Sequence, residues 1–162
     1  MNLVYDVNDL RAMTGMKPVR VYAEWDTFST PGVDVEDTIS ITVRYDNGAL
    51  GNWFAGSAVP GRADQFPNRT RLIGTKGQII LGSPLRIYVE EKHSELAAKT
   101  WHEVAVEEEP GSERARRVRS FAGAILEGRR PPVTGEDGRN ALAFILAAYR
   151  SGETHEAVIL QE

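Results

Sequence analysis

Three polar side chains of different chemistry share one face of a helix predicted near the start of the chain. At 100° per residue, the opposite face of this helix is formed by Leu3, Val7, Leu10 and Thr14. Tyr5, Asn8 and Asp9 therefore point away from the apolar side, and their phenol, amide and carboxylate groups can hydrogen-bond a polar ligand. An ordinary amphipathic helix with a polar outer face has the same pattern. The helix alone does not identify a site.

Arg11 lies on the flank of the same helix and has two interpretations. Its guanidinium could contact a substrate, or it could form a structural salt bridge with Asp9 or another acid. The structural interpretation is favoured.

Strands with one buried face are predicted through the middle of the chain, from about residue 18 to residue 106. Apolar and polar residues alternate over 19–25 and over 38–45, which is typical of strands buried on one side. Asp46-Asn47-Gly48 then predicts a type I′ hairpin turn, and Gly74-Thr75-Lys76-Gly77 predicts a second hairpin turn. Because they are closely spaced, all the strands should pair antiparallel. The further strands are expected at 49–54, 70–73, 78–81, 85–90 and 101–106.

Two helices and a short last strand, over 157–160, are predicted after these strands. The first helix, over about 112–127, should turn one apolar stripe to the core, formed by Ala115, Val118, Phe121, Ala122 and Ile125. The second helix should begin at an N-cap, Thr134, with Asp137 three residues later, and Gly152 is expected to cap its end.

Composition narrows the class of protein. The 162 residues suffice for one domain with a sizeable core. The net charge of −4 disfavours nucleic acid and anionic membrane surfaces as partners. There is no cysteine, the three histidines are scattered, and no long apolar stretch is present, so neither a metal site nor a membrane span is expected. A cytoplasmic protein fits this composition best.

The pattern Tyr5-x-x-Asn8-x-x-Arg11, followed by Thr14-Gly15, resembles the Gfo/Idh/MocA oxidoreductase family. Further strings resemble the C-terminal domain of that family, in family order, and together they cover nearly the whole chain. They are Val35-Glu36-Asp37-Thr38, Asn47-Gly48-Ala49, Ile73-Gly74-Thr75-Lys76-Gly77, Phe121-Ala122-Gly123-Ala124-Ile125, Gly135-Glu136-Asp137-Gly138 and Tyr149-Arg150-Ser151-Gly152-Glu153-Thr154.

The resemblance implies an α+β fold, an open and mostly antiparallel β-sheet with helices packed on one face. The other face commonly builds the oligomer interface, so a homo-oligomer through the sheet face is expected; a solvent face explains its polar residues equally well. Residues 1–162 would form a single C-terminal substrate-binding and oligomerisation domain, and the N-terminal Rossmann domain would be missing. The chain has no Gly-x-Gly-x-x-Gly turn for a dinucleotide pyrophosphate. NAD or NADP is therefore expected in the intact enzyme and not on this chain alone.

The resemblance also implies a reaction, in which an alcohol carbon of a sugar or polyol gives hydride to NAD or NADP. Tyr5 would then be the proton donor or acceptor. A phenol has an ordinary pKa of about 10, so it needs a nearby cation to act at neutral pH. In the family that cation is usually a lysine of the nucleotide-binding half.

Substrate contacts are expected from the other side chains of the first helix, Asn8, Asp9 and Arg11, and from three residues further along the chain. Trp53, Phe66 and Arg71 could line a sugar site, although an aromatic residue on an alternating strand is more often part of the core. The expected function is the substrate-binding and oligomerisation domain of a sugar or polyol dehydrogenase, inactive alone. The alternative is a stand-alone, non-catalytic binding or dimerisation module derived from that domain.

Overall fold

The computed structural model of the chain describes residues 3–57, 70–106 and 111–160. The chain divides into two compact units, one formed by residues 1–60 with 117–162 and the other by residues 61–116. None of the helices in the described ranges is both long enough and apolar enough to cross a membrane.

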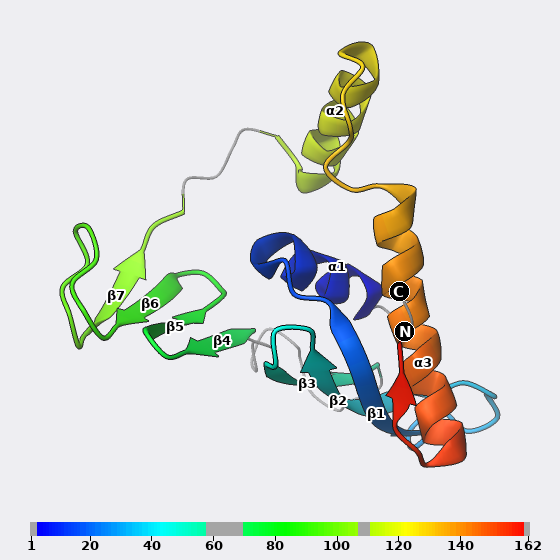
Figure 1. The fold of residues 1–162 in the computed structure, drawn as a ribbon. Coiled ribbons are helices and arrows are strands. Elements are labelled where there is room, and N and C mark those ends of the chain that lie inside the picture. Colours follow the sequence, from blue (N-terminus) through cyan, green and yellow to red (C-terminus); the bar gives the residue numbers. More distant parts are fainter. Residues whose placement is uncertain (1–2, 58–69, 107–110, 161–162) are drawn as a thin grey trace. The chain divides into compact units, whose positions relative to one another are not determined.

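A four-stranded antiparallel sheet forms the centre of the first unit (Figure 1). Its strands lie in the order β3-β2-β1-β8, so β1 has a neighbour on each edge. The antiparallel pairing predicted from the spacing of the strands is confirmed. The bounds of the strands are β1 Pro18–Asp26, β2 Thr38–Tyr45, β3 Leu50–Gly56 and β8 Val158–Ile159.

The core of the first unit lies between this sheet and α3, Gly135–Thr154, which runs along β1 (Figure 1). Phe144 and Ala148 of α3 are buried. The buried side chains of β1 and β2 alternate with exposed ones, as period-two patterning requires. Those buried are Val21, Ala23, Ile39, Ile41, Val43 and Tyr45. The other side of β2 is polar, and Ser40 and Thr42 are exposed there, so the prediction of one buried face is confirmed.

The β2–β3 hairpin forms where Asp46-Asn47-Gly48 predicted it, but the predicted type I′ turn is wrong. A type I′ turn needs positive φ at two successive residues, whereas here Gly48 has φ +85° and Asn47 does not have positive φ. Gly48 N donates to Tyr45 O at 3.0 Å, as in a type I turn followed by a glycine bulge. This form is stabilised by side chains, because Asn47 Oδ1 accepts from Ala49 N and Asp46 Oδ1 accepts from Lys17 N.

The second unit contains a four-stranded antiparallel meander in the order β4-β5-β6-β7. Gly74 pairs with Gly77 across Thr75 and Lys76, which confirms the predicted hairpin turn. A Cβ on Gly77 would lie 2.2 Å from the carbonyl oxygen of Tyr88, so this close approach of two backbones requires glycine. The bounds are β4 Arg71–Gly74, β5 Gly77–Ile80, β6 Leu85–Val89 and β7 Trp101–Val104.

The helix α2, Glu113–Leu126, forms as predicted, but its apolar stripe does not face a core. Val118, Phe121 and Ile125 are 63%, 54% and 65% exposed. The prediction that the stripe is buried is wrong, because the described part of the chain supplies no surface that covers it. The periodicity of a sequence predicts which side of a helix is apolar, but it does not predict whether another part of the protein covers that side.

The two ends of α3 differ from each other in how well the sequence predicted them. Thr134 and Asp137 form a reciprocal capping box at the N-terminus, which confirms the predicted N-cap. Gly152 does not cap the C-terminus, since the helix continues to Thr154 and ends at His155 in the left-handed conformation, with φ 55°. Gly152 has a different role, because a Cβ there would lie 2.2 Å from Cδ1 of Trp25 on β1.

Candidate active site

The first helix, α1 (Leu3–Thr14), presents its polar side to the exterior, as predicted. Leu3, Val7 and Leu10 are 7–8% exposed, whereas Tyr5 is 63% exposed. Next to Tyr5 on this outer side, Asn8 is half-buried and Asp9 is exposed. The sequence thus placed the three groups on the correct face of the helix.

The first helix has another helix as a neighbour. The backbone of α1 lies beside α3 (Figure 1), and α3 in turn covers β1.

Tyr5 is followed on α1 by two acids, Asp6 and Asp9. Its hydroxyl forms no hydrogen bond within the described residues. One residue along the helix, partial desolvation raises the pKa of Asp6, and the carboxylate of Asp9 raises that pKa further. The outer side of α1 therefore offers a hydroxyl, an amide and two carboxyl groups for binding a polar ligand.

Arg11 forms an ion pair with Asp137 at the start of α3, with 2.5 Å between Nη2 and Oδ1. This is the structural role that the sequence favoured, with Asp137 in place of Asp9 as the acid. Hydrogen bonds from Thr134 hold the pKa of Asp137 below its ordinary value, and the Arg11 guanidinium adds to the same effect. Arg11 Nη1 is buried and has no hydrogen-bond partner among the described residues.

Trp53 lies on β3 and packs with the core of the first unit. Its indole Nε1 donates to the hydroxyl of Tyr45 at 3.1 Å, and its ring centroid lies 6.4 Å from that of the buried Phe144. Burial raises the pKa of Tyr45, and the hydrogen bond from Trp53 partly offsets that shift. These contacts are those of a core aromatic residue, which was the alternative interpretation of Trp53.

The two remaining candidates lie outside the described part of the first unit. Arg71 belongs to the second unit, where its guanidinium donates to Gln78 Oε1 across the β4–β5 pair. Phe66 lies outside the described residues. The structure therefore brings together Tyr5, Asn8 and Asp9 on α1.

The tertiary contacts of two acids were not identified from the sequence. Asp137 was predicted to take part in a helix cap, and its contact with Arg11 is visible only in three dimensions. Asp37 is 4% exposed, and its carboxylate accepts backbone hydrogen bonds from Phe28, Ser29 and Thr30. These bonds lower the pKa of Asp37 to about 2. In the sequence, Asp37-Thr38 before a strand indicated only the resemblance to the family and gave no sign of these hydrogen bonds.

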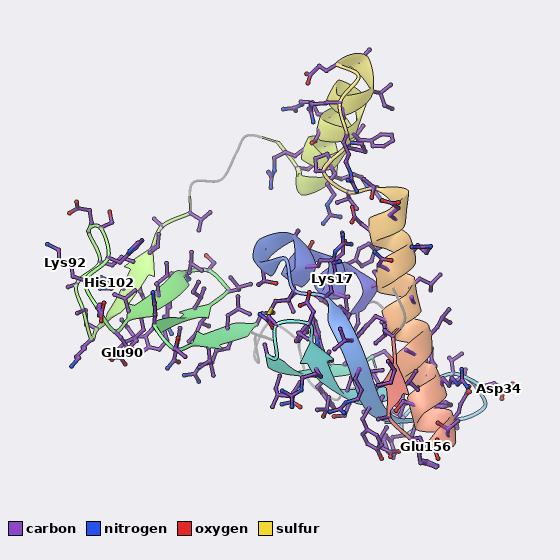
Figure 2. All side chains as sticks on the ribbon, in the orientation of Figure 1. Lys17, Asp34, Glu90, Lys92, His102 and Glu156 are labelled. Atoms are coloured by element: carbon purple, nitrogen blue, oxygen red, sulfur yellow. The ribbon has the colours of Figure 1, made fainter. Side chains whose placement is uncertain are left out.

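Histidine and carboxylate side chains do not gather as metal ligands would in the part of the chain that the structure describes. His102 lies on β7 in the second unit (Figure 2), where its Nε2 is 2.9 Å from Ala97 O. His155 ends α3 in the first unit, with Nδ1 3.4 Å from Glu24 Oε2.

The family can now be stated. The GFO/IDH/MocA C-terminal domain family model matches residues 2–80, and this part of the chain belongs to that family. The matched range includes α1 and all of the first sheet except β8. The resemblance predicted from the sequence is confirmed. No curated protein matches the chain.

Solved structures of oxidoreductases have the same fold. An aldose-aldose oxidoreductase from Caulobacter crescentus, complexed with glycerol, is 26% identical over 97% of this chain, with a TM-score of 0.78. An oxidoreductase domain protein from Kribbella flavida is 21% identical over 98%, with a TM-score of 0.81. Levoglucosan dehydrogenase, in complex with NADH and L-sorbose, is 19% identical over 99%, with a TM-score of 0.79. The predicted α+β fold is confirmed.

These proteins are much longer than the present chain. The aligned residues make up 45%, 48% and 49% of the three chains, in the same order. The chain thus spans less than half the length of the solved structures it matches.

Proposed function

We propose that the chain is the substrate-binding and oligomerisation domain of an NAD(P)-dependent oxidoreductase acting on the CH–OH group of a sugar or polyol. The match of residues 2–80 to the GFO/IDH/MocA C-terminal domain family supports the proposal that the intact protein is an oxidoreductase. The choice of sugar or polyol is supported by the likeness to an aldose-aldose oxidoreductase complexed with glycerol and to a levoglucosan dehydrogenase complexed with NADH and L-sorbose.

The observation that carries the proposal is the exposure of Tyr5 on the outer side of α1. A tyrosine that is 63% exposed, with a hydroxyl free of hydrogen bonds within the described residues, is available to a ligand. In the proposed reaction Tyr5 accepts the proton that leaves the substrate hydroxyl. Asn8 donates to and accepts from neighbouring hydroxyls without adding charge.

The nucleotide would be held outside these 162 residues, because the chain contains no Gly-x-Gly-x-x-Gly turn. We therefore propose that residues 1–162 act as one C-terminal domain beside a separate nucleotide-binding domain, and that the chain is inactive alone. The cation that would make the phenol reactive at neutral pH belongs to that other domain in this proposal.

Three large side chains support an oligomer formed through the outer face of the first sheet. Leu50 and Phe54 of β3 and Tyr22 of β1 are exposed on this face among polar residues. Interfaces commonly combine aromatic and apolar residues with a polar rim. The same face would serve the second candidate function, a non-catalytic binding or dimerisation module, in which Tyr5 has no role.

The test begins with the coding DNA upstream of Met1. An in-frame segment with a Gly-x-Gly-x-x-Gly turn is expected, and the longer protein that it encodes should oxidise sugars or polyols with NAD or NADP. In that protein Tyr5→Phe should lower kcat by about 100-fold or more, because the phenolic oxygen that accepts the proton is lost and packing is retained. The 162-residue chain with either nucleotide should show no oxidation.

Tyr88→Phe is the matched control, since Tyr88 lies in the second unit and its hydroxyl forms a 3.4 Å hydrogen bond to Glu90, an interaction outside the candidate site. It should leave kcat unchanged. If Tyr5→Phe leaves kcat unchanged as well, the proposed role of Tyr5 is wrong. An upstream stop codon would favour the binding or dimerisation module.

A further inference from the structure

A directional contact fixes the helix that carries Tyr5. Arg11 follows Asn8 by one helical turn, and Asn8 follows Tyr5 by one turn, so the three side chains lie in one row along α1. The buried residues of α1 determine which side faces inward, but apolar packing is not directional. The Arg11–Asp137 ion pair adds a fixed point at the end of this row.

Asp137 is itself held in place by the cap of α3. Its Oδ2 accepts from both the backbone N and the Oγ1 of Thr134, each at 2.8 Å. Its Oδ1 remains for Arg11 Nη2. The side chains of Arg11 and Asp137 are 29% and 13% exposed, so solvent screens this pair less than it screens a surface pair.

We propose that Arg11 and Asp137 are positioning residues, which set the rotation of α1 about its axis and thereby the places of the Tyr5 hydroxyl and the Asn8 amide. This proposal rests on the proposed function of Tyr5. A misplacement of about 1 Å at a reacting group lowers rates by about 100-fold, so a small rotation of α1 would be enough to lower the reaction rate. Asp137, one residue of the α3 cap, thus also orients the candidate site through its contact with Arg11.

The experiment uses the 162-residue chain labelled with 3-fluorotyrosine, in which Tyr5→Phe assigns the ¹⁹F resonance of Tyr5. Arg11→Gln and Asp137→Asn should each shift this resonance. Both should also speed amide hydrogen exchange in α1 by roughly tenfold, because local opening becomes easier. Arg11→Lys, which keeps a charged donor for Asp137 Oδ1, should restore most of both signals.

Two control variants separate positioning from general destabilisation. Arg139→Gln removes an exposed arginine from the same end of α3 and should change neither signal. Thr134→Ala removes the hydroxyl of the cap but keeps the backbone N–H that donates to Asp137 Oδ2 and the ion pair with Arg11, so it should lower the Tm while the Tyr5 resonance stays in place.

The proposal is overturned if Arg11→Gln and Asp137→Asn behave as Arg139→Gln does, or if Thr134→Ala shifts the Tyr5 resonance as much as Asp137→Asn does. These signals report the place of Tyr5 and not turnover. A failure of the proposed function in the kinetic test of Tyr5→Phe would therefore be distinguished from a failure of the positioning role.

Discussion

The helices α1 and α2 have similar sequence patterns and opposite surroundings. Each has an apolar stripe at three- and four-residue spacing. The stripe of α1, which includes Leu10, is buried where the helix lies beside α3, and an ion pair ties the two helices together. The stripe of α2, which includes Phe121, is exposed. An amphipathic pattern therefore predicts a helix and its apolar side, and a tertiary contact decides whether that side contributes to stability.

The largest expected effect that sharpens this comparison is that of Leu10→Ala in α1. Leu10 is 7% exposed, so truncation leaves a cavity, and the free energy of unfolding should fall by about 2–4 kcal/mol. Urea denaturation measures this change. Leu126→Ala in α2 is the matched control, because Leu126 is 87% exposed and should cost less than about 0.5 kcal/mol. Equal losses for the two variants would contradict the difference between the helices.

Gly152→Ala tests the contrast between a covered and an uncovered position within one helix, α3. The added methyl group would meet the indole of Trp25, which packs edge-on against Tyr149 and donates to the backbone of α3, so the ring cannot move away freely. We expect a net loss of about 1–3 kcal/mol in the free energy of unfolding.

The control for Gly152→Ala is Gly138→Ala near the other end of α3, where a Cβ meets nothing within 4 Å. It should stabilise the chain by about 0.5–1 kcal/mol, because alanine favours the helix. Thermal denaturation of both variants compares them directly. A stabilising Gly152→Ala would refute the close approach of α3 to β1.

Asp37→Asn tests a region that is stabilised by hydrogen bonds and not by apolar packing. The charged carboxylate accepts three backbone hydrogen bonds, so this variant should lower the Tm at neutral pH by about 5 °C. The pKa of Asp37 is lowered from 3.8 to about 2 on folding. Its contribution is therefore present above the ordinary pKa and is lost as the pH falls toward 2. The Tm difference between parent and variant should shrink between about pH 5 and pH 2, and a constant difference would exclude this role of the charge.

The smallest expected effect is that of Phe121→Ser in α2. Phe121 is exposed, so the substitution should change the free energy of unfolding by less than about 0.5 kcal/mol in urea denaturation. A loss above about 1 kcal/mol would show that the stripe of α2 is covered in solution, and the contrast with α1 would then disappear.

The sequence predicted elements better than it predicted their contacts. Alternation and turn residues located the strands of both sheets and the two hairpins, because these signals act between neighbours in the chain. The turn type predicted at Asn47-Gly48 was wrong. The side-chain oxygens of Asp46 and Asn47 accept hydrogen bonds from backbone N–H groups, and these bonds favour a different turn. Gly152 was misjudged as a cap because only the folded chain brings it against Trp25.

The same division applies to the candidate site. The outward side of α1 followed from helical geometry alone, so Tyr5 and Asn8 were placed correctly. Trp53 has a residue type suited to a sugar site, and its partners Tyr45 and Phe144 show that it packs in the core. The partner of Arg11 was beyond the sequence, because several acids were available and their distances depend on how α1 meets α3.

The order of strands in the first sheet also governs how this unit is made in the cell. One edge of β1 pairs with β2 soon after both are synthesised, but its other edge pairs with β8, at Arg20 with Ile159 and Val21 with Val158. Synthesis proceeds from the N-terminus, so this second edge of β1 has no partner until β8 leaves the ribosome. An open strand edge is a template for pairing with other chains. The nascent chain is thus most prone to aggregate before β8 appears, and the pairing of β8 with β1 ends that period.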